Sequence, residues 1–126
     1  MRKTNRTRAL WTVTLLYWLL LFISTHIPGG NLPTIPVSDK TEHLIGYGLL
    51  GSLLLLSIWS GRTRFSNPPL MVLAIGMTYA AIDEWLQALP FVHRDCDRLD
   101  WFADTTGLAI AVILLTAARA LRGWAV

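Results

Sequence analysis

The chain has 126 residues, of which 53% are hydrophobic and 15% are charged, with a formal net charge of +3. A soluble domain usually carries about 25% charged residues. This composition excludes a soluble globular enzyme, and the high hydrophobicity excludes an intrinsically disordered chain. Cys96 is the only cysteine, which excludes a disulfide framework. The length suits a single domain over 1–126.

Four apolar segments approach the length of about 20 residues that a membrane-spanning helix needs. Their apolar runs are continuous rather than alternating, so helices are favoured over the strands of a membrane barrel. We predict helices over 9–27, 39–60, 68–89 and 100–118. The expected fold class is therefore an all-α, integral membrane four-helix bundle.

The first predicted helix, 9–27, contains no Lys, Arg, Asp or Glu and follows a basic start. A signal peptide has the same order of features, but this apolar run is long for one and no A-x-A-like cleavage site follows it. We therefore expect a retained helix that ends before Pro28. His26, near its end, is expected at the membrane interface.

The second predicted helix begins with polar residues that share one face. Asp39, His43 and Tyr47 follow one another at intervals of four residues, with Lys40 beside them. A carboxylate can orient an imidazole, so His43 is a candidate catalytic base with Asp39 as its partner. The alternative for Asp39 is a structural N-cap, with Glu42 completing a capping box. Metal binding by His43 and two or three carboxylates stays open, because this spacing is not a strong metal signature.

The third predicted helix has acidic residues close to its C-terminal end. Asp83 and Gln87 are four residues apart on one face, and Glu84 lies beside them. The lipid and the helix macrodipole both oppose a carboxylate there, so a basic residue, a metal ion, a proton or water must compensate. We interpret Asp83 and Glu84 as candidate catalytic residues and Gln87 as a ligand-binding candidate. A purely structural ion-pair network is the alternative.

The loop before the fourth predicted helix supplies Arg94, and Asp100 and Asp104 follow on one face of that helix. Arginine suits the recognition of a carboxylate or a phosphate, but Arg94 could equally pair with Asp83 or Asp100. Asp100 can also cap the helix, as the macrodipole favours. Gly107, with an alanine four residues before and after it, permits the close approach of another helix.

The charges predict an orientation in the membrane, because basic residues gather on the cytoplasmic side. With the N-terminus inside, all the acidic residues fall in the outer half. Eight of the 11 Lys and Arg residues fall inside: Arg2, Lys3, Arg6, Arg8, Arg62, Arg64, Arg119 and Arg122. Both termini are then cytoplasmic. The net positive charge is explained by anionic lipid headgroups, so we expect membrane lipid and no nucleic acid as a partner.

Three of these motifs resemble those of the VanZ-like family. They are Asp39-Lys40-x-x-His43-x-x-x-Tyr47-x-x-x-Gly51, then Asp83-Glu84-x-x-Gln87, then Arg94 followed by Asp100-x-x-x-Asp104-x-x-Gly107. The resemblance covers most of the chain and implies a small multi-pass protein of the bacterial inner membrane. The founding member of the family is associated with low-level resistance to the glycopeptide teicoplanin. The family usually has Asn where this chain has Asp104.

Three functions fit this pattern, and the favoured one is a binding site on the outer side for a lipid headgroup or a cell-envelope precursor. Arg94 would bind an anionic group and the acids an amine. The other ligand-binding candidates are Asp39, Lys40, Tyr47, Gln87, Asp100 and Asp104. The second function is a membrane-embedded hydrolase or transferase acting on a lipid-linked or cell-wall substrate, with His43 as base and Asp83 or Glu84 as acid or metal ligand. The third is a purely structural polar network. No nucleophile motif or cofactor fingerprint is present, and the sequence leaves the cofactor and any oligomer open.

Overall fold

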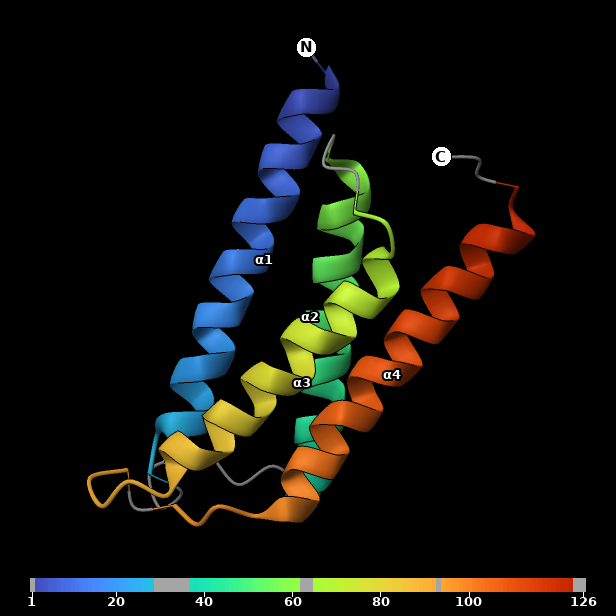
Figure 1. The fold of residues 1–126 in the computed structure, drawn as a ribbon. Helices are drawn as coiled ribbons and strands as arrows, with labels where there is room; N and C mark the ends of the chain where they lie inside the picture. The colour runs from blue at the N-terminus through green and yellow to red at the C-terminus, as the bar shows by residue number, and fades with distance from the viewer. Residues whose placement is uncertain (1, 29–36, 62–64, 93, 124–126) are drawn as a thin grey trace.

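The structure, a computed structural model, describes residues 2–28, 37–61, 65–92 and 94–123. Over these ranges it contains helices and no strand. The helices are α1 (Arg2–His26), α2 (Asp39–Ser60), α3 (Pro68–Gln87) and α4 (Arg98–Leu121) (Figure 1). The predicted all-α class with four helices is confirmed.

The helix bounds differ from the prediction at several ends, whereas α2 begins and ends where it was predicted to. α1 begins at Arg2 and α4 continues to Leu121, because Lys, Arg, Ala and Leu are good helix formers that extend both helices beyond their apolar runs. α3 ends at Gln87 rather than residue 89, where the N–H of Ala88 bonds to the carbonyl of Trp85 in a tight turn.

The N-terminal caps place the polar residues that follow them. Ser38 caps α2 by accepting from the N–H of Thr41, and Asp97 caps α4 by accepting from the N–H of Leu99 at 2.8 Å. Both caps have the extended backbone that the capping position requires. The suggested capping roles of Asp39 and Asp100 are therefore wrong. Each lies one position or more inside its helix, which leaves its side chain available for other contacts.

Helix α2 is the centre of the arrangement and packs against each of the other three helices. Its buried face includes Tyr47, Leu50 and Leu54, which form one apolar core with Leu108 of α4. α2 and α4 approach closely at Gly107, where a Cβ atom would lie 2.1 Å from the carbonyl oxygen of Leu44. The predicted small-residue contact is thus a real helix crossing, and it brings the first turns of α2 and α4 together.

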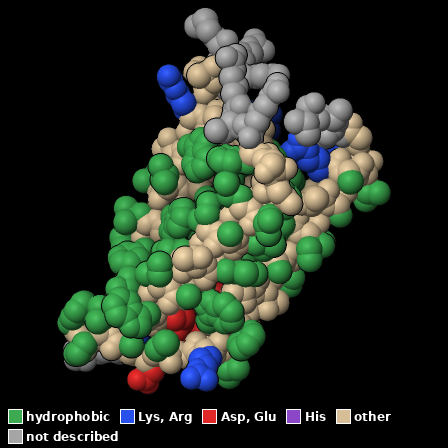
Figure 2. Space-filling model, viewed as in Figure 1, with side chains coloured by type: hydrophobic (Ala, Val, Ile, Leu, Met, Phe, Trp, Pro, Cys, Tyr) green, Lys and Arg blue, Asp and Glu red, His purple; other side chains and the backbone are tan. Residues whose placement is uncertain are grey.

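All four helices are long and apolar enough to cross a membrane, which indicates a multi-pass membrane protein. Large hydrophobic side chains are exposed on their outer faces, including Leu20 of α1 and Leu114 of α4. Figure 2 shows hydrophobic side chains over the middle of one face and acidic side chains near its lower end. We call that end, where α1 and α3 finish and α2 and α4 begin, the polar end. The start of α1 and the finish of α4 both lie toward the opposite end, apart from each other (Figure 1).

Candidate functional site

The polar end brings every predicted site residue into one connected network. α2 supplies Asp39, Lys40, His43 and Tyr47. α3 supplies Asp83, Glu84 and Gln87. α4 supplies Asp100 and Asp104, and the α3–α4 loop supplies Arg94. Each of these side chains lies within 4.0 Å of another member.

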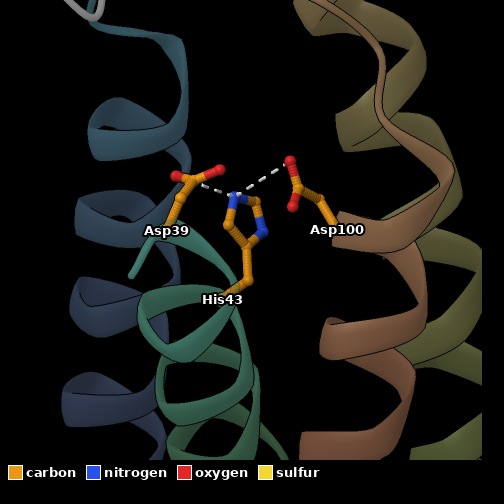
Figure 3. A group of neighbouring side chains, drawn as sticks. All are labelled: Asp39, His43 and Asp100. Carbon is orange, nitrogen blue, oxygen red and sulfur yellow. Dashed lines mark ion pairs between the residues drawn. The ribbon is translucent and has the colours of Figure 1, made fainter. Parts of the chain in front are cut away.

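His43 lies at the centre of the network, with its side chain 5% exposed. Its Nδ1 atom lies 2.9 Å from Oδ1 of Asp104. Its Nε2 atom points between two carboxylates, at 3.9 Å from Asp39 and 4.0 Å from Asp100 (Figure 3). The residue within hydrogen-bonding distance of the ring is therefore Asp104 rather than Asp39, the partner predicted from the spacing.

Asp83 is fully buried and lies among hydrogen-bond donors. Two of them were in the predicted site: the Tyr47 hydroxyl donates to Oδ2 at 3.1 Å, and Gln87 Nε2 donates to the same oxygen at 3.4 Å. Such donors stabilise a carboxylate at the negative end of a helix, which lipid and the macrodipole oppose. Hydrogen-bond donors surround Asp83, and no Lys or Arg among the described residues forms an ion pair with it.

Three further residues around Asp83 were not predicted. The hydroxyls of Thr25 and Tyr79 each donate to Oδ1 at 3.2 Å, and Nδ1 of His26 lies 3.7 Å from the same oxygen. The signal for Tyr79 was present, because it precedes Asp83 by four residues on the same helix face. Thr25 and His26 come from the end of α1, whose sequence gave no indication of the face that it turns to α3.

Glu84 is 3% exposed and links α3 to the start of α4. Its Oε2 accepts from the N–H of Asp97 at 3.0 Å, and its Oε1 accepts from Gln87 Nε2 at 3.3 Å. The same Oε1 lies 4.0 Å from Nδ1 of His43. Because α3 ends at Gln87, Glu84 and Asp83 lie about one helical turn from the end of α3, closer to it than the predicted helix end implied.

Lys40 joins α2 to the start of α4. Its Nζ donates to Oδ2 of Asp97 at 2.6 Å and to Oδ1 of Asp100, and lies 3.9 Å from Asp39. The Lys40 hydrogen bond holds the pKa of the Asp97 carboxyl below its usual range, and the N–H of Leu99 acts in the same direction. Lys40 therefore donates to two carboxylates and lies near a third, which leaves this side chain little capacity for an anionic ligand.

Arg94 pairs with neither Asp83 nor Asp100, the two partners suggested by the sequence. Its NH1 group donates to the carbonyls of Ser24 at 3.4 Å and Thr25 at 3.0 Å, and its NH2 group lies 3.7 Å from Asp39. The last carbonyls of a helix lack intrahelical partners, so Arg94 caps α1. The side chain is 17% exposed.

The network contains more acidic than basic groups. Its carboxylates are Asp39, Asp83, Glu84, Asp97, Asp100 and Asp104. Within the described ranges, Lys40 and Arg94 are its Lys and Arg side chains, and His26 and His43 add two imidazoles. Two overlapping groups have the spacing of metal ligands: His43 with Asp39 and Asp100, and His43 with Glu84 and Asp104. Oδ2 of Asp104 and Nε2 of His26 are buried without a hydrogen-bond partner.

Comparison of the chain with models of known protein families, with curated proteins and with solved structures finds no match. The geometry of the polar end and the motifs in the sequence are therefore what indicates a function.

Proposed function

We propose that this chain is a small multi-pass protein of the bacterial inner membrane whose polar end, on the outer side, binds a lipid headgroup or a cell-envelope component. The observation that carries this proposal is the excess of carboxylates over basic side chains in the polar network. Such an excess favours a ligand with a positively charged group, because charge-assisted hydrogen bonds to a carboxylate are among the strongest that proteins form.

The partly exposed residues of the network, which we call the rim, suit an ammonium group more than an isolated anion. Asp39 is 52% exposed and lies 3.7 Å from Arg94 and 3.9 Å from Lys40 and His43, beyond hydrogen-bond distance. An ammonium group would therefore find an accessible carboxylate. Arg94 uses only part of its five-donor guanidinium on α1 and Asp39, so the neighbouring phosphate of a zwitterionic headgroup would also find a donor.

The proposed orientation has support from the end of the bundle opposite the polar end. Arg6 and Arg8 of α1 lie there, together with Arg119 and Arg122 at the end of α4. Basic residues favour the cytoplasmic side. Arg62 and Arg64, which entered the same prediction, lie outside the described residues. The resemblance of the three motifs to VanZ-like proteins supports a role at the cell envelope.

Lipid preference tests the proposed function directly. Native mass spectrometry of the detergent-purified protein would compare phosphatidylethanolamine, which has a primary ammonium group, with phosphatidylglycerol, which has none. We expect the first lipid to bind more tightly, and Asp39→Asn to reduce that preference about tenfold, since one hydrogen bond to a charged group contributes roughly 1.5 kcal/mol or more. Asp95→Asn is the matched control, because Asp95 is an exposed carboxylate in the α3–α4 loop, outside the polar network. Equal binding of the two lipids would contradict the proposal.

A second function is favoured by one contact, the close approach of His43 to Asp104. A carboxylate beside one ring nitrogen holds the imidazole in place, while the other nitrogen, Nε2, faces the rim. This is the arrangement of a general base with an orienting partner. The test incubates bacterial lipid extract with the wild-type protein and with His43→Gln, and compares the products by mass spectrometry. A product that forms only with the wild-type protein would favour the enzyme; its absence would favour the binding function.

A further inference from the structure

We propose that Nδ1 of His43 and the carboxylates of Glu84 and Asp104 bind one divalent transition-metal ion. We call these residues the inner triad. They come from three different helices, α2, α3 and α4, and all are buried. One imidazole with two carboxylates is a donor set that zinc and its neighbours in the first transition row accept. A metal site goes beyond the headgroup binding proposed above, which uses the rim.

The distances within the inner triad match ligands that surround one ion. Nδ1 of His43 lies 2.9 Å from Oδ1 of Asp104 and 4.0 Å from Oε1 of Glu84, and the ligand atoms all lie within 4.8 Å of one another. In a tetrahedral zinc site with metal–ligand bonds of about 2.1 Å, the ligand atoms are about 3.4 Å apart. The observed separations lie on both sides of this value, so the three groups are close enough to surround one ion.

Both ring nitrogens of His43 face carboxylates. Nδ1 lies 2.9 Å from Oδ1 of Asp104, whereas Nε2 lies 3.9 Å from Asp39 and 4.0 Å from Asp100 (Figure 3). A metal ion bound to Nδ1 would take the place of the proton shared with Asp104. The N–H of the neutral ring would then be on Nε2 and face Asp39 and Asp100, as metal-binding histidines almost always place their other N–H against a carboxylate.

A second observation, independent of the clustering, also indicates a ligand. Asp104 is 0% exposed, and its Oδ2 is buried without a hydrogen-bond partner. Buried acceptors are rarely left unsatisfied. Asp39 and Asp100 have Arg94 and Lys40 beside them, whereas among the described residues Glu84 and Asp104 form ion pairs with His43 alone. The inner triad therefore sets two buried carboxylates against a single imidazole.

The remaining contacts of Glu84 hold its carboxylate in position. Its Oε2 accepts from the N–H of Asp97, and Gln87 donates to its Oε1. Hydrogen bonds of this kind orient a ligating carboxylate and strengthen metal binding. The site is thus supported on both sides, by Asp39 and Asp100 behind the imidazole and by Asp97 and Gln87 beside Glu84.

The experiment measures Zn²⁺ binding to the full chain in detergent, without an affinity tag and in a Cys96→Ser background. That background is needed because the exposed thiol of Cys96 could itself bind zinc. The protein is treated with chelator and dialysed, and Zn²⁺ is then titrated by calorimetry and counted by mass spectrometry of the metal. We expect about one Zn²⁺ per chain and a higher unfolding temperature with Zn²⁺ than without it.

The matched variants are Glu84→Gln and Asp104→Asn, which keep the size of each side chain while removing its charge. We expect each to raise the Kd for Zn²⁺ by at least about tenfold and to abolish the thermal stabilisation by Zn²⁺. Asp95→Asn and Glu42→Gln are the controls, because both acids are exposed and lie outside the inner triad. Their Zn²⁺ affinity should equal that of the parent protein.

Absence of Zn²⁺ binding, or equal binding in the inner-triad variants and the controls, would overturn the inference. If the variants fail to fold, the X-ray absorption spectrum of the zinc-loaded parent protein tests the inner triad as the metal site. A first shell of nitrogen and oxygen with an imidazole signature supports the site, and a shell without imidazole overturns it. A protein that binds no Zn²⁺ but prefers phosphatidylethanolamine contradicts the metal site and leaves the proposed function standing. A protein that binds Zn²⁺ at the inner triad but shows no lipid preference contradicts only the proposed function.

Discussion

The hydroxyl of Tyr47 donates a 3.1 Å hydrogen bond to Oδ2 of Asp83, and both side chains are 0% exposed. The contact joins the central helix α2 to α3 at the depth where a carboxylate is least expected, in the last turns of a helix of membrane-spanning length. The Tyr47 hydroxyl is one of several groups that donate to this carboxylate, and the stability of the polar end depends on these donors.

Replacement of Tyr47 by Phe tests that dependence. The variant leaves a buried charged acceptor with one donor fewer, which costs about 1–3 kcal/mol of unfolding free energy. Tyr17→Phe is the matched control, because the Tyr17 hydroxyl donates to the uncharged carbonyl of Gly46 at 2.8 Å, and a neutral hydrogen bond contributes about 0.5–1.5 kcal/mol. Thermal unfolding in detergent would compare the two. Equal losses would show that Asp83 does not depend on this hydroxyl.

The sequence predicts which residues share a face, because helix geometry alone fixes positions four residues apart. Asp39, His43 and Tyr47 do point into one network, and so do Asp83 and Gln87. Spacing does not predict partners on other helices. His43 lies against Asp104 rather than Asp39, because the crossing of α2 and α4 at Gly107 determines which carboxylate reaches the ring.

The helices were predictable because runs of about 20 apolar residues have few alternatives, but their ends and rotations were not. Ser38 and Asp39 are both good capping residues, so the sequence could not choose between them. α1 is apolar on all sides along most of its length and therefore has no marked face. That is why Thr25 and His26 were not predicted as neighbours of Asp83.

The helix crossing at Gly107 leads to a prediction about stability. A Cβ atom there would lie 2.1 Å from the Leu44 carbonyl oxygen and 3.0 Å from the Gly48 nitrogen. Backbone atoms cannot yield as a side chain does, so Gly107→Ala should separate α2 from α4 and lower the unfolding free energy by at least about 1–3 kcal/mol. The measurement is the yield and unfolding temperature of the purified variant.

Gly46→Ala is the control for that crossing. At Gly46 the nearest atom to an added Cβ is the end of the Leu21 side chain at 3.1 Å, which can rotate away. A Gly46→Ala protein that is as unstable as Gly107→Ala would show that the loss reflects glycine content rather than the α2–α4 contact.

The Lys40–Asp97 contact predicts a dependence of stability on pH. The pKa of Asp97 is lowered in the folded protein, first by the Lys40 hydrogen bond. A lowered folded pKa contributes stability above the unfolded value of about 3.9, and that contribution is lost as the pH falls through the folded value. Asp97→Asn keeps a capping side chain and should be less stable than wild type at pH 6, with the difference shrinking towards pH 3. Unfolding temperatures measured across this range check it, and a constant difference would contradict it.

The single cysteine allows a test of the proposed orientation. Cys96 is exposed in the segment between α3 and α4 at the polar end. If this end faces outward, a membrane-impermeant maleimide should label Cys96 in intact cells. In a Cys96→Ser background, Asn5→Cys places a thiol on an exposed position of α1 at the opposite end, and labelling should require permeabilised cells. The reverse pattern would place the carboxylates on the cytoplasmic side, where an outer headgroup or cell-wall precursor could not reach the rim.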